Sequence, residues 1–548
     1  MSVTYQCQRC QHEFTVADKD LEFYRKIKVP SPKWCPQCRM QKKLAFWPFG
    51  KFHLRECDLD GSKIVSILSK KTRFPVYKAS NWFSDKWEAP QIEFSPQKDF
   101  FEQFRDLQER TPHPHQLGIK NVNCDYSDDV WYSKNCYLCR SLAKCEDVLY
   151  GYRIVECRNS LDITYCYNTE NSYDCTYCFD VNKVKYAFDV RHSFDSAFLF
   201  DCRNVNNCFM CWNLRNKSYC ILNKQYSPEE YRRKLKEYDL GDAQVVETLR
   251  KKFWELVAKE AIGRAHYNVK TVNSEGNYLT ECKNCRETYL SETSEDCCYV
   301  FRGLQNKDSY DSVGLFNCEL CAHSVQLTDC YDVKYSIFST NCRYSEYLDS
   351  CVDCEYCFGC VGLKKKKYHF LNKEYSPDEY FELVKKVKKE LAKYEKNNYF
   401  WPLNLAFVGY NLSLGGIYFP QDKEGVEEEG GFWEELEETK IGARSVAARP
   451  DNIKEVSDDI LKQALVCQKS SRPFGIHPKE LDFYRKNNIP LPAYYPDERT
   501  KERILRMGNF QPRQANCCFC NKRINVTFSP NLNLENVACD QCYLQKVV

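Results

Sequence analysis

The sequence lacks the features of several protein classes. No apolar run approaches the roughly 18 residues that a membrane-spanning helix needs, and the mean hydropathy is −0.63. Lys and Arg number 79 and Asp and Glu 76, so the formal charge of +3 excludes a uniformly basic coat for nucleic acid. The segment MSVTYQCQRC has neither a charged nor an apolar signal region. We therefore expect a cytoplasmic protein with no secretory signal and no membrane partner.

Signatures of common enzymes are also missing. The 548 residues contain no Walker loop and no GxGxxG, HExxH or GxSxG motif. His113 and His115 lie in the Pro-rich stretch TPHPHQ, which we interpret as a linker. A nucleophilic Cys–His pair stays open as an alternative, because its two members would meet only in the fold. We expect a protein without catalytic residues.

Cysteine, in contrast, is abundant. The chain has 35 cysteines, an odd number, and many of them form CxxC pairs. A secreted disulfide scaffold is typically shorter than this chain. In a reducing compartment such pairs are metal ligands or buried thiols. The composition therefore favours metal sites over disulfide bonds.

The two ends of the chain are copies of one module. A shift of 460 residues aligns them without a gap over roughly 75 residues, which indicates an internal duplication. The matched pairs include Cys7 with Cys467, Phe14 with Phe474, Tyr24 with Tyr484, Arg39 with Arg499 and Cys57 with Cys517.

Each module has room for two four-ligand metal sites and keeps one of them. Two CxxC pairs can complete a tetrahedral Zn²⁺ site. Four thiolates leave no open coordination position, so we expect two structural zinc ions, with an iron–sulfur cluster as the alternative. The intact sets are Cys7, Cys10, Cys35 and Cys38 in the first copy and Cys517, Cys520, Cys539 and Cys542 in the second.

The other two sites have lost their ligands. We expect buried aromatic side chains to fill the space that a metal would occupy, since Trp82 and Tyr495 stand at ligand positions. The replaced sets are Cys57, Asp60, Ala79 and Trp82 in the first copy and Cys467, Ser470, Tyr495 and Glu498 in the second.

The N-terminal module also resembles a known domain. The pattern of Cys7, Cys10, Phe14, the run from Leu21 to Tyr24 and the stretch CPQCR is similar to a small treble-clef domain of bacteria described as probable zinc-binding. The likeness covers residues 5–45, and residues 467–505 resemble it with three ligands missing. The segments CDLDGSKIVSI, FPVY with SDKW, and NKxYSxxEY give the layout a resemblance to uncharacterised Cys-rich proteins of candidate-phyla-radiation bacteria. That resemblance implies an architecture and no activity.

The middle of the chain is a second duplication. NKQYSPEEY at 223–231 recurs as NKEYSPDEY at 372–380, an offset of 149 residues. Within each copy some cysteines recur every 21 residues, as at Cys124, Cys145 and Cys166. A period of this length with Asn, Asp and Ser corners is typical of a β-solenoid. We predict a mainly β fold with helical caps, in which two tandem Cys-rich β-solenoids of about 21 residues per coil are flanked by duplicated treble-clef or zinc-ribbon modules.

Two interpretations of the solenoid cysteines remain open. The first is that they are small apolar side chains filling a narrow interior. The second is that stacked thiols bind metal, which is possible but not expected, and disulfides fit the stacking geometry poorly. Residues three apart on an extended strand face opposite sides, which argues against one metal site at Cys351, Cys354, Cys357 and Cys360.

A helix is predicted to close each solenoid. Ser227-Pro228 and Ser376-Pro377, each followed by two acidic residues, have the pattern of an N-cap and first turn. The lysine-rich face of the second helix is interpreted as solvated.

The predicted divisions are a zinc module (1–90), a linker (91–119), solenoid 1 with a helix pair (120–265), solenoid 2 with a helix (266–398), a connector (399–450) and the second zinc module (451–548).

For function, the sequence favours a non-enzymatic zinc-binding scaffold. We expect nucleic acid or a ribonucleoprotein as its target, because the first module carries basic residues beside many aromatic ones. A protein–protein scaffold and thiol-rich metal storage or sensing are the alternatives. The oligomeric state is left open. The candidate nucleic-acid contacts are Arg39, Lys42, Lys43, Lys51 and Arg55.

Overall fold

The computed structural model describes residues 2–392, 400–435, 445–508 and 511–548, and its chain divides into two compact units. Unit 1 comprises Met1–His115 and His266–Glu434, and unit 2 comprises Gln116–Ala265 and Glu435–Val548. Each unit therefore combines one end module with one Cys-rich region from the middle of the chain. The finer domain boundaries remain a prediction.

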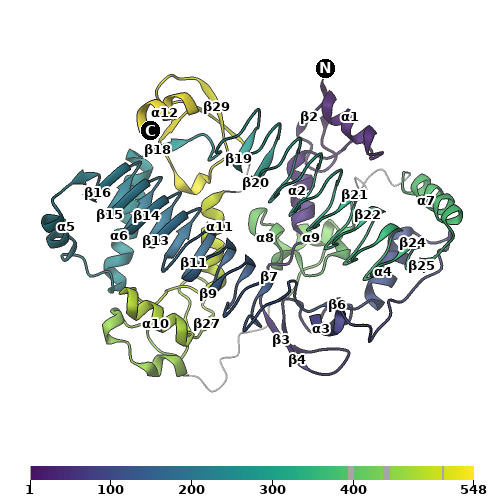
Figure 1. Ribbon diagram of the computed structural model, residues 1–548, viewed down its shortest axis with the longest axis horizontal. Helices are drawn as coiled ribbons and strands as arrows, with labels where there is room; N and C mark the ends of the chain where they lie inside the picture. The colour runs from purple at the N-terminus through teal and green to yellow at the C-terminus, as the bar shows by residue number, and fades with distance from the viewer. Residues whose placement is uncertain (1, 393–399, 436–444, 509–510) are drawn as a thin grey trace. The chain divides into compact units, whose positions relative to one another are not determined.

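Unit 2 contains an 11-stranded sheet whose strands pair parallel to one another except for the last strand, which is antiparallel (Figure 1). Asp128 pairs with Arg140, Arg140 with Tyr152, and Tyr152 with Thr164, so the register is 12 residues. We call each 12-residue segment a coil and the whole series, residues 122–225, the unit-2 stack. Its strands are β7 (Asp128–Trp131), β8 (Arg140–Ala143), β9 (Glu146–Leu149), β10 (Tyr152–Val155), β11 (Arg158–Tyr167), β12 (Tyr173–Thr176), β13 (Phe179–Phe188), β14 (Arg191–Phe200), β15 (Arg203–Trp212), β16 (Arg215–Ile221) and β17 (Lys224–Gln225).

Unit 1 contains a shorter parallel series, the unit-1 stack, at residues 269–374. Phe301 pairs with Val313, Val313 with Val325, and Val325 with Ile337, again in a register of 12 residues. Most of its pairings are isolated bridges, so few strands are long enough to be named. They are β19 (Gly276–Thr280), β20 (Thr288–Glu292), β21 (Tyr331–Lys334), β22 (Arg343–Glu346), β23 (Glu355–Phe358), β24 (Lys367–Phe370) and β25 (Lys373–Glu374).

The predicted coil of about 21 residues is therefore wrong, and the backbone shows why. Within both stacks, nearly every third residue has a positive φ, as at Asn204 (53°), Asn207 (49°) and Met210 (53°). A residue in this left-handed region turns the chain, and Asn and Asp adopt it more readily than most residues do. A left-handed residue thus recurs about four times in each 12-residue segment. The spacing of 21 between cysteines is one of many multiples of three that keep a residue on the inner face.

One residue in three faces the interior of each stack. The interior of the unit-2 stack is a buried cluster of Cys, Val, Leu and Ile side chains, and the unit-1 stack has similar clusters. The backbone N–H of an inward residue can also point inside, where a side chain of the preceding coil accepts its hydrogen bond. The Cys136 N–H donates to Cys124 Sγ (3.4 Å), and the Cys351 N–H donates to Ser339 Oγ (3.2 Å). Cysteine and serine therefore fill a narrow space and also satisfy a buried donor from the next coil.

Helices close the C-terminal end of each stack, as predicted. The hydroxyls of Ser227 and Ser376 accept N–H groups of the first helical turn, and Ser376 forms a full capping box. An antiparallel strand precedes each helix and pairs with the last parallel strand. The helix at this end is α5 (Pro228–Leu235) in unit 2 and α7 (Pro377–Leu391) in unit 1. The next helix of unit 2, α6 (Ala243–Glu260), packs on the side of the stack, where Phe253 contacts Phe198.

The rest of each unit, which includes its end module, consists of short hairpins and helices (Figure 1). In unit 1 they are β1 (Ser2–Gln6), β2 (Glu13–Ala17), α1 (Asp18–Lys26), α2 (Pro36–Leu44), β3 (His53–Glu56), β4 (Lys63–Ser66), β5 (Val76–Tyr77), α3 (Ala79–Trp82), α4 (Phe100–Arg110), β6 (His113–Pro114), α8 (Leu414–Tyr418) and α9 (Lys423–Glu428). In unit 2 they are β18 (Ile262–Arg264), β26 (Leu465–Val466), β27 (Pro473–Phe474), α10 (Pro478–Asn487), α11 (Pro496–Met507), β28 (Arg513–Asn516), β29 (Arg523–Val526), β30 (Asn536–Ala538) and α12 (Asp540–Val547).

Candidate metal centres

The first four-cysteine group lies between a hairpin turn and a helix start. Cys7 and Cys10 occupy the turn between β1 and β2, Cys35 is the N-cap of α2, and Cys38 lies in the first turn of that helix. All four Sγ atoms lie within 4.8 Å of one another, and those of Cys10 and Cys35 are 3.7 Å apart. The sequence-predicted ligands are therefore brought together.

The second group repeats this geometry in unit 2. Cys517 and Cys520 occupy the turn between β28 and β29, Cys539 is the N-cap of α12, and Cys542 follows within the first turn. The four Sγ atoms again lie within 4.8 Å of one another, with Cys520 and Cys539 3.8 Å apart. Cys518, adjacent in sequence, is exposed and lies outside the group.

The backbone around both groups favours thiolates. The Cys35 N–H donates to Cys7 Sγ at 3.2 Å, and the Cys539 N–H donates to Cys517 Sγ at 3.3 Å. The hydrogen bond from the Cys38 thiol lowers the pKa of Cys35 to about 5, and the same hydrogen bond raises the pKa of Cys38. For Cys517, desolvation raises the pKa, but backbone N–H groups outweigh it and lower the pKa to about 6. Four thiolates held this way can bind a soft or borderline divalent ion in a closed tetrahedral site.

The two sites that lost their metal ligands keep the backbone geometry of the turn. Cys57 and Cys467 each begin a turn in which their N–H donates to the carbonyl five residues later, as Cys7 and Cys517 do. The residue four positions on has a positive φ in every case: Gln11 (62°), Gly61 (71°), Ser471 (55°) and Asn521 (58°). Each end module therefore contains two turns of one geometry, and one of the two supplies two cysteines to a four-cysteine group.

Direct contacts replace the metal ligands at the Cys57 turn. The Asn81 side-chain amide donates to Asp60 Oδ2 (2.6 Å) and contacts Cys57 Sγ (3.6 Å). Trp82 is 2% exposed, and its indole N–H donates to the Pro112 carbonyl at 2.8 Å. The expectation that an aromatic side chain fills this site agrees with the burial of Trp82.

At the Cys467 turn the replacement is more polar than expected. The Arg472 guanidinium lies 4.1 Å from the ring centroid of Tyr495, which is half-buried. Lys469 Nζ lies 3.5 Å from a carboxylate oxygen of Glu498, which stands at a former ligand position. A stacked cation and an exposed ion pair thus take the place of the metal.

The predicted basic surface of the N-terminal module does not form, because most of its side chains are buried. Arg39 and Lys43 are each 2% exposed, and Lys42 and Arg55 are each 8% exposed. Only Lys51 of the five candidates is partly accessible. The reason is docking within unit 1, since α2 turns its basic face toward other parts of that unit.

One partner of this basic face is an acidic residue that the sequence prediction missed. Arg39 Nε donates to Asp311 Oδ1 at 2.5 Å, and Tyr24 also donates to Asp311 at 2.5 Å. In unit 2 the equivalent Arg499 pairs with Asp162. Asp311 and Asp162 are related by the offset of 149, and the arginines by the offset of 460. Both partners of this ion pair thus recur in the second copies of their regions, and this paired recurrence was the sequence signal that each module docks on a stack.

The run Cys351, Cys354, Cys357 and Cys360 also requires a correction. All four are buried in one interior cluster, so the expectation that residues three apart face opposite sides is wrong here. Each thiol donates to backbone carbonyls, as Cys360 does to Phe358 and His369 at 3.4 Å. Among the described residues, only the two end groups bring three or more ligand atoms within 4.8 Å of one another.

Comparison with known proteins adds no name to these centres. No protein-family model matches the sequence, and the search of curated proteins found no match. Within the described ranges, no helix has the length and apolar character needed to cross a membrane.

Proposed function

We propose that the protein is a zinc-stabilised, non-enzymatic binding scaffold built from two β-solenoids. The observation that carries this proposal is the pair of four-thiol groups, each with Sγ atoms within 4.8 Å. Each group joins a hairpin turn to a helix start in a module that docks on one stack. A metal ion there would hold the docking module in shape, and the stack would supply the extended surface.

Zinc is the metal that this donor set favours. Four thiolates in a tetrahedral arrangement suit Zn²⁺ or an iron–sulfur cluster, and hard oxygen-preferring ions are excluded by the ligands. Backbone N–H groups that donate to Sγ atoms orient the thiolates and reduce the repulsion among them. A site with four protein ligands has no open position for water or substrate, so its proposed role is structural.

The surface of the stacks favours a protein partner over nucleic acid. Neighbouring coils place opposite charges side by side, as in Lys134 with Glu146 (3.1 Å) and Lys283 with Glu295 (2.6 Å). Such pairs neutralise each other locally, so they attract a polyanion weakly. With four of the five candidate basic residues buried, contact with nucleic acid or a ribonucleoprotein stays a prediction from composition alone.

Metal content is the first test of the proposal. Protein purified without added metal should contain two zinc ions per chain, measured by elemental analysis. Six or more metal ions per chain, or iron or copper in place of zinc, would contradict the proposal and favour metal storage in the stacks. Binding to a captured partner that survives high salt would support the protein scaffold, whereas salt-sensitive binding to RNA or DNA would favour the nucleic-acid alternative.

A further inference from the structure

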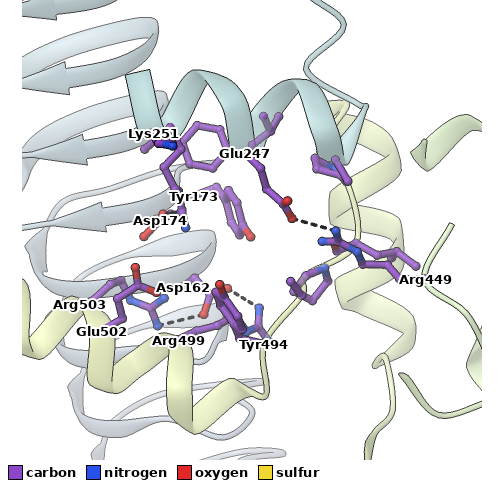
Figure 2. A pocket seen from close by; sticks show the side chains of 18 of the residues that line it. Asp162, Tyr173, Asp174, Glu247, Lys251, Arg449, Tyr494, Arg499, Glu502 and Arg503 are labelled. Atoms are coloured by element: carbon purple, nitrogen blue, oxygen red, sulfur yellow. Dashed lines mark hydrogen bonds and ion pairs between the residues drawn. The ribbon is translucent and has the colours of Figure 1, made fainter. Parts of the chain in front are cut away.

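Unit 2 contains a pocket of about 350 Å³ that the metal centres and the proposed scaffold role do not use. It lies between α6, α11, the segment 490–494 and the strands of the unit-2 stack (Figure 2). A volume of this size is within the range of small-molecule sites. Residues that line it include Asp162, Tyr173, Asp174, Tyr186, Glu247, Arg250, Trp254, Arg449, Leu491 and Arg503.

Two tyrosine hydroxyls in this pocket lack partners. Tyr173 is 7% exposed and Tyr186 is 5% exposed, and neither hydroxyl has a hydrogen bond to any described residue. Figure 2 shows the Tyr173 hydroxyl pointing into the open space below α6. Both residues line the open pocket, so each hydroxyl can donate to a group that enters it. An acceptor that enters the pocket would satisfy both hydroxyls.

The charges around the pocket favour an anion. Asp162 is held by Arg499 and Arg503, and both oxygens of Asp162 are used in these ion pairs. Asp174 is held in the same way by Arg250 and by another arginine of α11. Burial raises the pKa of Asp174, but Arg250 and its neighbouring arginines outweigh that effect and lower it. Arginines thus neutralise both buried carboxylates, so an acidic group that enters the pocket would meet little net negative charge from them.

One wall of the pocket is apolar. Pro490, Leu491 and Pro492 form a segment on one side, and the Trp254 indole lies on α6. The Arg449 guanidinium closes the rim by an ion pair with Glu247 at 2.8 Å. A ligand that combined one acidic group with an apolar body would match both parts of the surface.

The equivalent place in unit 1 is filled by the protein itself. The positions of Tyr173 and Tyr186 correspond to Ala322 and Tyr335 by the offset of 149. Trp401 is 1% exposed there, and its indole N–H donates to the Tyr335 carbonyl. Phe400 packs beside it, with the Lys43 ammonium 5.3 Å from its ring centroid. The position that matches Tyr186 is thus covered by protein in unit 1, although a separate pocket of about 460 Å³ opens beside Trp34 and Lys42 in that unit.

We propose that the unit 2 pocket binds a small organic anion, with an acidic group accepting hydrogen bonds from Tyr173 and Tyr186 and an apolar body packing on Trp254 and residues 490–492. A carboxylate and a phosphate monoester share this chemistry. The proposal is independent of the metal in the end modules, because none of the eight candidate ligand cysteines lines the pocket.

Calorimetric titration of the full-length protein tests the proposal. The probes are benzoate and phenyl phosphate, with benzyl alcohol as the neutral analogue of the same shape. We expect saturable binding of at least one anion, and its relative affinity for the two probes distinguishes carboxylate from phosphate. Tyr173→Phe should weaken that binding about fivefold to tenfold, the effect of one lost hydrogen bond.

The variants separate recognition from stability. Because the Tyr173 hydroxyl is unpaired, Tyr173→Phe should leave the melting temperature of the free protein unchanged or higher. Tyr186→Phe is expected to act in the same direction. Tyr344→Phe, at a tyrosine that is 40% exposed in unit 1, is the matched control and should alter neither property.

Three results would overturn the proposal. One is the absence of heat with either anion at millimolar concentration, which would make the pocket a hydrated gap. Another is equal binding of benzyl alcohol, which would show that the acidic group is not recognised. The third is unchanged anion affinity in both tyrosine variants, which would place the ligand elsewhere.

Discussion

Replacing Ser324, an inward residue of the unit-1 stack, tests why the interior is rich in cysteine and serine. Ser324 is fully buried, its Oγ accepts the Ser336 N–H at 3.2 Å, and its hydroxyl donates to the Ala322 carbonyl at 2.9 Å. Ser324→Ala leaves the Ser336 N–H without an acceptor. The cost of one unsatisfied buried donor is about 1–3 kcal/mol. We expect Ser324→Ala to lower the free energy of unfolding by about 2 kcal/mol.

The matched variant is Ser324→Cys, which keeps an acceptor at the same place. A cysteine accepts the inward N–H of the next coil elsewhere, as Cys124 does from Cys136 at 3.4 Å. We therefore expect Ser324→Cys to cost less than about 1 kcal/mol, owing only to the larger sulfur atom. Urea unfolding followed by circular dichroism measures the global effect, and amide exchange at Ser336 measures the local one. Equal stability of the Ala and Cys variants would refute the account of the interior.

Two further predictions concern unit 1. Cys35→Ser should remove one of the two metal ions per chain and make the N-terminal module sensitive to limited proteolysis, whereas Cys518→Ser, at an exposed cysteine outside both groups, should retain both ions. Burial lowers the pKa of Lys43 from 10.5 to about 7. The unfolded chain therefore binds this proton more tightly, and the stability of unit 1 should rise as pH increases from about 7 to 10. Lys43→Met should be more stable than the native protein at pH 7 and lose that advantage near pH 10, and a difference that is constant with pH would contradict the burial argument.

The two four-cysteine groups could be predicted from the sequence because their geometry is local. A CxxC turn fixes two thiols in space, and a second pair at a helix start requires only that the two segments meet. The turn at Cys57, with Gly61 at the position of positive φ, shows that the same backbone persists when the ligands are lost. The sequence did not show which other segment of the chain each module packs against. The burial of Arg39 depends on Asp311, which lies 272 residues away in the chain.

The coil length could not be predicted from cysteine spacings, because cysteine is only one of several residues that face inward. Serine, valine and leucine occupy the same inner face, so the visible cysteines sample multiples of three at irregular intervals. The actual repeat is set by backbone conformation, with a left-handed residue at nearly every third position. Many of these positions are occupied by Tyr, Lys or Glu, which carry no turn signal of their own. Nearly every third residue of the stacks is buried, but residues of several types occupy these inward positions, so the repeat is difficult to recognise in the sequence.

The abundance of cysteine in this chain therefore has two separate physical origins. At the end modules, Sγ atoms accept backbone N–H groups from Cys35 and Cys539, a pattern that stabilises thiolates and suits a metal ion. Inside the stacks, thiols donate to carbonyls two residues before and nine residues after, as Cys351 does at 3.5 and 3.4 Å. A thiol that donates a hydrogen bond keeps its proton, and burial raises the pKa of Cys351 well above its usual value. The same residue type is thus proposed to serve as a metal ligand where four Sγ atoms lie within 4.8 Å of one another and as a neutral packing group where each thiol donates to backbone carbonyls.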